Sequence, residues 1–138
     1  MILVIRISGM IGLTKEMQES LHRIRLRRKY SATLLEETSF NRKLLKKIRN
    51  FIAYGDIEDQ EIKKLIAKRG EAKENKKIVV EDSLEQIKKS GFLKSNLKPF
   101  FRLHPPRGGI ETKKHFGVGK GVLGDHKSKI KLLLEKML

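Results

Sequence analysis

The sequence predicts an α+β fold of the ferredoxin-like type: a two-layer sandwich with a β-α-β-α-β core, a helical insertion, a glycine-rich basic C-terminal arm and a terminal helix. Short runs rich in β-forming residues alternate with segments whose apolar residues recur at helical spacing. Right-handed crossovers place the two connecting helices on one face of the sheet. A chain of 138 residues with 38% apolar content suits one modest core with extensions.

The first strand and helix follow from the opening of the chain. Leu3, Ile5 and Ile7 share one parity in the run ILVIRI, which predicts a strand over residues 2–7 with one well buried face. After a glycine turn, the side chain of Thr14 can cap a helix. That helix runs into RLRRK, where cations suit the negative end of the helix dipole.

The second strand, the second helix and the third strand complete the core. Clusters of β-forming residues predict the two strands at residues 30–36 and 51–54. Thr38 or Ser39 starts the helix between them, and Phe40 belongs to the apolar stripe of that helix. The lysines and arginines of the helix then lie on its outer face.

We place this core at residues 1–58, with its last strand stopped by Gly55, and the extension at residues 59–138. The extension is expected to decorate the core. Its expected elements are a helix ending at Gly70, a charged mobile loop over residues 71–77, a short helix with a capping box at Asp82 or Ser83 that ends at Gly91, an extended segment over residues 99–104, a glycine-rich basic stretch to Gly124, and a final helix.

The charge balance indicates the kind of partner. Lys and Arg number 32 against 16 Asp and Glu, a net charge of +16. Such an excess destabilises a compact chain through self-repulsion unless a polyanion neutralises it, which makes nucleic acid the leading partner. No apolar run approaches the roughly 20 residues that span a bilayer, so we expect no membrane partner. The absence of cysteine excludes a disulfide framework and a thiolate zinc site, and it fits an intracellular location.

One motif suggests a dinucleotide cofactor, but its context argues against that interpretation. GKGVLG, Gly119 to Gly124, matches G-x-G-x-x-G. The fingerprint needs a strand directly before it and an acidic residue about 20 positions after it. The preceding KKHFGV is basic and glycine-broken, and the chain ends too soon for the acidic residue. We therefore expect no cofactor and interpret the segment as a flexible loop whose glycines permit close approach to phosphates.

Metal and catalytic patterns are weak in this sequence. The four histidines, His22, His104, His115 and His126, form no i, i+4 pair and lack a carboxylate cluster, which favours surface or RNA-stacking roles over a metal site. The acidic residues between 56 and 61 lack the spacing of an EF-hand and suit the start of a helix. No sequence signature places a base beside a hydroxyl nucleophile. We therefore expect that the protein is not an enzyme and has no catalytic residue and no small-molecule substrate.

The basic segments carry the strongest functional signal. RLRRK at residues 25–29 contains no acid, so its charges gain nothing from local pairing. The stretch from residue 97 to 138 holds ten Lys and Arg against three acids, and tails of this kind order against RNA. The predicted RNA-binding residues are Arg25, Arg27, Arg28, Lys29, Arg42, Lys43, Lys46, Arg102, His104, Arg107, Lys113, Lys114, His115 and Lys120.

The segment from HPPRGG to HFGVGKGVLG is expected to act as one arm that enters RNA. Pro105 and Pro106 hold the chain extended and donate no backbone hydrogen bonds. We therefore expect the arm to project from the molecule instead of folding back onto the sheet, with the strand before it and the helix after it as its fixed ends.

Several of these segments carry a family resemblance. FRLHPPRGG, Phe101 to Gly109, followed by GVLG and a helix ending KLLLEKM, resembles the C-terminal signature of the archaeal and eukaryotic large-subunit ribosomal proteins of the universal thirty family, called seven in eukaryotes. RLRRKYSATLLEETSFNRKLLKKIRNFIAYGDIE, Arg25 to Glu58, is similar to the second half of that family's core. The similarity covers nearly the whole chain, and the lack of a long basic N-terminal extension favours the archaeal type.

The resemblance implies a structural constituent of the large ribosomal subunit, located in the cytoplasm within the ribosome, that binds large-subunit rRNA and carries no catalysis. It implies neighbouring ribosomal proteins as partners and leaves a contact with the 5S rRNA region open. The chain departs from the family at Glu37 to Ser39, where a proline is common, and at Lys127 and Ser128, where a glycine is usual.

Two alternatives from other classes stay open. A free-standing RNA chaperone or nucleic-acid-binding protein has the same charge but no stable place in ribosomes, so co-sedimentation with large subunits separates it from a ribosomal protein. A ferredoxin-like phosphatase needs an anion-binding loop after its first strand, and RISGMIG, Arg6 to Gly12, is the candidate. A hydrolysis assay decides that second alternative.

Overall fold

Six strands form one sheet in the computed structural model, which describes residues 1–9, 12–73, 77–92, 94–117 and 121–138. The strands within those ranges are β1 Ile2–Arg6, β2 Ser31–Leu35, β3 Ile52–Asp56, β4 Phe101–Arg102, β5 Glu111–His115 and β6 Gly121–Asp125. The helices are α1 Lys15–Arg23, α2 Ser39–Lys47, α3 Asp59–Arg69, α4 Val80–Ser90 and α5 Ile130–Met137, with the short 3-10 helix η1 Lys127–Lys129 before α5. The strand order in the sheet is β4-β2-β1-β3-β6-β5.

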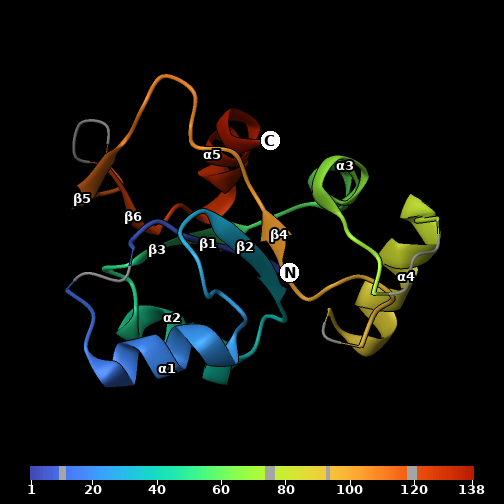
Figure 1. The fold of residues 1–138 in the computed structure, drawn as a ribbon, viewed down its shortest axis with the longest axis horizontal. Helices are drawn as coiled ribbons and strands as arrows, with labels where there is room; N and C mark the ends of the chain where they lie inside the picture. Colours follow the sequence, from blue (N-terminus) through green and yellow to red (C-terminus); the bar gives the residue numbers. More distant parts are fainter. Residues whose placement is uncertain (10–11, 74–76, 93, 118–120) are drawn as a thin grey trace.

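The first three strands and two helices confirm the predicted ferredoxin-like core. β2 and β3 lie on either side of β1 and both run antiparallel to it, so they are parallel to each other and α2 makes the crossover between them. α1 and α2 lie together on one face of the sheet (Figure 1). Thr14 and Thr38 cap these two helices as expected, each accepting a hydrogen bond from the backbone N–H three residues later.

The extension covers the opposite face of the sheet, so a further layer of helices is added to the core. α3, α4 and α5 lie on that face (Figure 1), and their apolar side chains form one cluster with Leu3 and Ile5. Ile2 and Val4 pack with α1 and α2 on the other face. The sequence predicts one well buried face for this strand, but every residue of β1 is fully buried because the extension supplies the second cover.

The glycine-rich basic stretch does not project from the molecule as one arm. β6 runs parallel to β3 and beside it, and β5 pairs with β6 at the edge of the sheet. Val122 and Leu123 enter the core, with 5% and 4% exposure. The prediction of a projecting flexible loop is therefore wrong for residues 121–124, because burying two aliphatic side chains favours folding back onto the sheet. Residues 118–120 of that stretch lie outside the described residues.

Gly55 has a packing role and does not end its strand as predicted. It lies inside β3, opposite Leu3 of β1. A Cβ atom at Gly55 would lie 2.3 Å from the carbonyl oxygen of Lys127 and 2.9 Å from the Cβ of Ile130. The missing side chain lets the turn into α5 pack directly against the strand.

Two helices differ in detail from the sequence prediction. Phe40 is predicted in the apolar stripe of α2, but it is 75% exposed and lies at a surface cleft that Leu44 and Phe92 also line. α4 begins before the expected capping box, and Ser83 is buried inside the helix, where its hydroxyl donates to the side-chain oxygen of Asn96 at 3.1 Å. Ser83 therefore fits the sequence pattern of a capping box, although it is a buried residue inside the helix with a hydrogen-bond partner distant along the chain.

The loop predicted at residues 71–77 falls partly outside the described residues, which exclude 74–76. In its described part, Ala72 forms an antiparallel β-bridge with Leu97. The backbone N–H of Lys98 donates to the carbonyl oxygen of Glu71 at 2.8 Å. The beginning of this segment is thus tied to the chain that leads into β4.

The guanidinium of Arg6 ties the end of β1 to two loops. Arg6 is fully buried, and its side chain donates to three carbonyl oxygens: from Nε to Ser8 at 2.9 Å, from Nη1 to Leu26 at 2.8 Å and from Nη2 to Gly9 at 3.2 Å. Burial lowers the pKa of Arg6. The carbonyl contacts offset part of the cost of removing the charge from water.

Replacing Arg6 with Met should lower the free energy of unfolding by about 2–4 kcal/mol, because three carbonyl oxygens lose their donor inside the protein. Urea unfolding at neutral pH measures the change. Arg23→Met is a matched control at an exposed position near the end of α1, and its effect should stay within about 0.5 kcal/mol. If Arg6→Met proves as stable as the control, Arg6 does not tie these loops together.

His126 is buried between β6 and η1. Its ring Nε2 donates to the carbonyl oxygen of Val122 at 2.5 Å, and the ring stacks on Phe116 with centroids 4.2 Å apart. The backbone N–H of His126 donates to the carbonyl oxygen of Tyr54 at 2.7 Å. Burial lowers the pKa of His126, and the Val122 carbonyl and the Asp125 carboxylate act in the opposite direction without overcoming it.

The lowered pKa of His126 predicts a loss of stability in mild acid. The unfolded chain binds a proton at this residue near pH 6.5, whereas the folded chain binds it only at lower pH. The free energy of unfolding should therefore fall as the pH drops below about 6.5, by up to about 1.4 kcal/mol per pH unit, until the folded pKa is reached.

Urea unfolding at one pH above about 6.5 and at one pH below it checks this prediction. The decrease in stability on acidification should be smaller for His126→Gln than for the unmodified chain. His22→Gln, at an exposed position on α1, is the control and should retain the full decrease. Equal decreases in all three proteins would show that His126 does not cause the acid sensitivity.

Candidate nucleic-acid interface

The basic run Arg25–Lys29 lies in the loop between α1 and β2, and the end of α1 fixes its first residues. The N–H of Leu26 donates to the carbonyl oxygen of Leu21 at 2.9 Å, and the N–H of Arg25 donates to that of His22 at 3.0 Å. These are the two hydrogen bonds of a Schellman motif. Arg25 occupies the left-handed position of the motif, with φ 67°, where glycine is usual. Leu26 is fully buried and anchors the loop in the core.

Hydrogen bonds to the core fix the other end of this loop. The N–H of Tyr30, whose φ is 64°, donates to the carbonyl oxygen of Arg6 at 2.7 Å. The N–H of Ser31 donates to the carbonyl oxygen of Arg28 at 3.2 Å, and Arg6 Nη1 holds the carbonyl oxygen of Leu26. The exposed arginines of the loop therefore extend from a backbone that is held at both ends.

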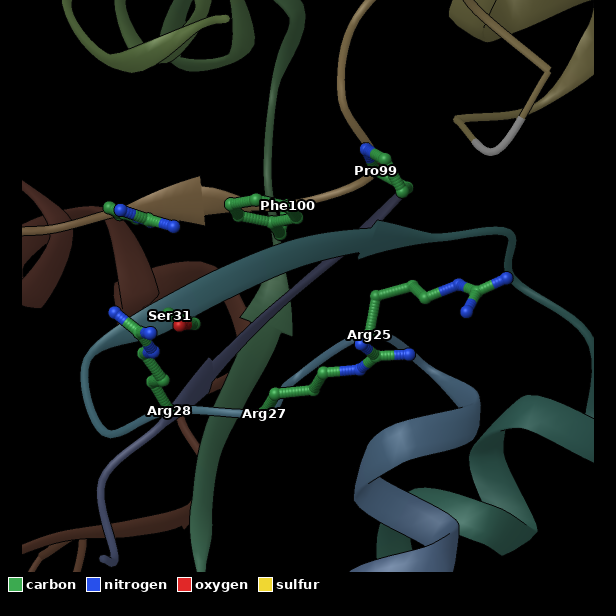
Figure 2. Close-up of a pocket in the computed structure, with 7 residues that line it drawn as sticks. Arg25, Arg27, Arg28, Ser31, Pro99 and Phe100 are labelled. Carbon is green, nitrogen blue, oxygen red and sulfur yellow. The ribbon is translucent and has the colours of Figure 1, made fainter. Parts of the chain in front are cut away.

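The loop arginines lie across a cleft from the segment that leads into β4. The cleft has a volume of about 340 Å³. β4 reaches this place by pairing with β2, where Ser31 lies opposite Arg102. Figure 2 shows Arg25 and Arg27 below the β2 ribbon, Arg28 at the beginning of that ribbon, and Pro99 and Phe100 above it. The residues that line the cleft are Arg25, Arg27, Arg28, Ser31, Pro99, Phe100 and Arg102.

The chemistry of this cleft suits an anion with an aromatic part. Among the described residues, no carboxylate forms an ion pair with any of its four arginines. The guanidinium carbon of Arg102 lies 5.5 Å from the centroid of the Phe100 ring, within cation–π distance. Arginine binds phosphate oxygens in a bidentate manner and also stacks on bases. Lys29 is exposed beside the cleft, with its ammonium 5.0 Å from the ring centroid of Tyr30.

The predicted RNA-binding residues of α2 are in a different electrostatic state. Arg42 donates to Glu37 at 2.6 Å and to Asp56 at 2.7 Å, and these carboxylates raise the pKa of Arg42. Its charge is therefore largely matched within the protein. Lys43 and Lys46 are exposed on α2, and neither lines the arginine cleft.

Apart from Arg102, the described predicted residues of the C-terminal segment do not line the arginine cleft. The N–H groups of His104 and Arg107 donate to the carbonyl oxygens of Met137 and Lys136, which holds the HPPR segment against the end of α5. β4 and β5 occupy opposite edges of the sheet, so the basic residues of β5 are not brought to the cleft. His104, Arg107, Lys113, Lys114 and His115 are all exposed. Lys120 lies outside the described residues.

The structure adds Phe100 and Arg6 to the candidate residues that the sequence indicates. Phe100 lines the cleft, and Arg6 positions the loop that carries its arginines. The double phenylalanine PFF contains a signal for Phe100, since alternate residues of an extended segment point to opposite faces and only Phe101 is buried. No sequence pattern indicates that Arg6 reaches Leu26, because the two residues are distant along the chain.

In the described part of the chain, no group of three or more histidines and carboxylates is placed to hold a metal ion. None of the helices there is both long enough and apolar enough to cross a bilayer.

Comparison with known proteins reveals relatives along the whole chain. The chain is 33% identical to the large ribosomal subunit protein uL30 of Methanosphaera stadtmanae, with 98% of each chain covered. It is 35% identical to the protein of that name from Methanobrevibacter smithii, over 100% of both chains. It is 36% identical to the one from Aeropyrum pernix, over 98% of this chain and 97% of the relative. No protein-family model matches the chain.

The left-handed backbone at Arg25 predicts that replacing this residue with glycine stabilises the folded chain. Arg25→Gly should raise the free energy of unfolding by about 1 kcal/mol, because glycine adopts this φ without a clash at Cβ. Arg27→Gly is the matched control, since it removes the same charge at a position without a positive φ, and it should not stabilise the chain. Urea unfolding of both variants measures the difference. A loss of stability in Arg25→Gly would mean that the side chain has a structural role.

Proposed function

We propose that this chain, which belongs to the uL30 family of large ribosomal subunit proteins, is a structural constituent of the large ribosomal subunit and binds the rRNA of that subunit. uL30 is the universal thirty family that the sequence resembles. Binding without catalysis is the proposed activity. Neighbouring ribosomal proteins are further partners, and the ribosome in the cytoplasm is the proposed location.

The arginine cleft is the observation that supports this proposal most strongly. Its four arginines are exposed, extend from a fixed backbone and lack carboxylate partners among the described residues. Such arginines repel one another in the free protein. Binding of RNA phosphates neutralises this repulsion. The net charge of +16 favours the same kind of partner.

A second RNA contact is part of the proposal. The exposed cations of β5 lie at the edge of the sheet opposite β4, and those of the HPPR segment lie near the end of α5. The chain can therefore contact two RNA segments, one at each edge, and we include the 5S rRNA region among the candidates for the second. The exposed Lys43 and Lys46 on α2 provide further phosphate contacts, while Arg42 mainly stabilises the protein through its ion pairs.

The loop after β1 gives little support to the alternative of a phosphatase. Arg6 is the cation of that loop, but it is fully buried and its guanidinium is committed to the carbonyl oxygens of Ser8, Gly9 and Leu26. A phosphate would have to displace those contacts. Residues 10 and 11 of the loop lie outside the described residues.

Salt dependence of rRNA binding tests the proposal. Replacing Arg25, Arg27 and Arg28 together by Gln should lower the slope of log affinity against log salt by about 2–3, because each lost phosphate contact removes roughly 0.7–0.9 from it. Purified large-subunit rRNA from an archaeal relative serves as the ligand in a filter-binding titration.

A second triple variant with the same charge change controls for the loss of net charge. Lys63, Lys64 and Lys68 are exposed on α3, and their replacement by Gln should change the slope less than the loop variant does. Failure of the unmodified chain to bind large-subunit rRNA more tightly than a random RNA duplex would overturn the proposed function. Equal slopes for the two triple variants would show that the cleft does not take part in rRNA binding.

A further inference from the structure

The arginine cleft has a feature that phosphate binding alone does not explain. Phe100 lines it beside four arginines, and its ring is only half-buried. Its neighbour Phe101 is in the core, where it stacks on Phe92 with ring centroids 5.0 Å apart. Because successive residues of an extended chain point to opposite faces, burial of Phe101 directs Phe100 and Arg102 toward the cleft.

The position of Phe100 is fixed on both sides. Phe101 and Arg102 pair with β2 through Ala32 and Ser31. On the other side, the hydroxyl of Thr33 donates to the carbonyl oxygen of Pro99 at 3.3 Å. The aromatic ring therefore extends from a backbone that is attached to the sheet, and Arg102 lies over it at 5.5 Å. A pre-positioned aromatic surface of this kind loses little freedom when a planar ligand stacks on it.

The size and charge of the cleft fit one nucleotide. Its volume of about 340 Å³ lies at the lower end of the range for small-molecule sites. The loop arginines lie across it from Phe100 (Figure 2), so a phosphate and a base can be held at the two sides at once. A base inside a duplex is covered on both faces by its neighbours and cannot stack on a side chain.

We infer that this cleft binds an unpaired nucleotide of the RNA, with the base stacked on Phe100 and Arg102 and the adjacent phosphate held by Arg25, Arg27 and Arg28. The inference rests on the proposed function, since it specifies which part of an RNA occupies this site. Stacking is tolerant of base identity because every base has a π face. The site therefore selects single-stranded or bulged RNA over duplex without reading a sequence.

A pair of oligonucleotides separates stacking from charge. The probes are a 12-nucleotide oligo(A) RNA and an abasic RNA of the same length, which carries the same phosphates without bases. The unmodified chain should bind oligo(A) about tenfold more tightly than the abasic strand, which is the usual effect of one stacked base. Phe100→Leu should remove most of that difference and leave the salt slope of oligo(A) binding unchanged, because no charge is lost.

Phe40→Leu is the matched control. Phe40 is a phenylalanine with 75% exposure on α2 that does not line the cleft, and its replacement should leave the preference for oligo(A) intact. Equal binding of the two strands by the unmodified chain would overturn the inference, as would a Phe100→Leu variant that keeps the full preference. The proposed function is tested separately by binding of large-subunit rRNA, which persists through phosphate contacts if only the nucleotide site is wrong.

Discussion

All five residues of β1 are fully buried because helices lie on both faces of the sheet at its centre, and the rest of the fold depends on that double cover. α1 and α2 bury one set of alternate side chains, and the extension buries the other set. The extension therefore shares one of these two clusters with residues of the first 58, among them Leu34 and Ala53. The division into a core of residues 1–58 and an extension of residues 59–138 remains a prediction.

The same constraint explains how the loop that carries the candidate arginines is held in place. β1 ends in Arg6, whose buried guanidinium holds the carbonyl oxygen of Leu26 and whose backbone carbonyl receives the N–H of Tyr30. The loop between α1 and β2 is thus attached to the central strand. Its strained φ at Arg25 and Tyr30 is maintained by these attachments, and a glycine at position 25 would relieve strain at the cost of one cation.

Sequence periodicity predicted the core elements well, because local rules govern them. Thr14 and Thr38 cap helices by contacts within three residues, and the continuous apolar run ILVI of β1 is visible in the sequence alone. The same reasoning failed where a tertiary contact decides. Val122 and Leu123 lie among glycines and cations, so local composition favoured a loop, and only the open edge of β3 gives these two side chains a place to be buried.

The candidate interface could likewise be predicted only in part from the sequence. The acid-free run RLRRK identified Arg25, Arg27 and Arg28 correctly as exposed cations, but their proximity to Phe100 and Arg102 depends on the pairing of β2 with β4. Arg42 shows the opposite case. It is one of many basic residues in the sequence, and only the fold brings Asp56 beside it.

A cryo-electron-microscopy map of the large ribosomal subunit from the organism that encodes this chain tests most directly whether the arginine cleft is the RNA-binding face. We predict density for the chain on rRNA, with phosphates beside Arg25, Arg27 and Arg28 and a base against Phe100. A map in which the chain is present but this cleft faces solvent or another protein would contradict it.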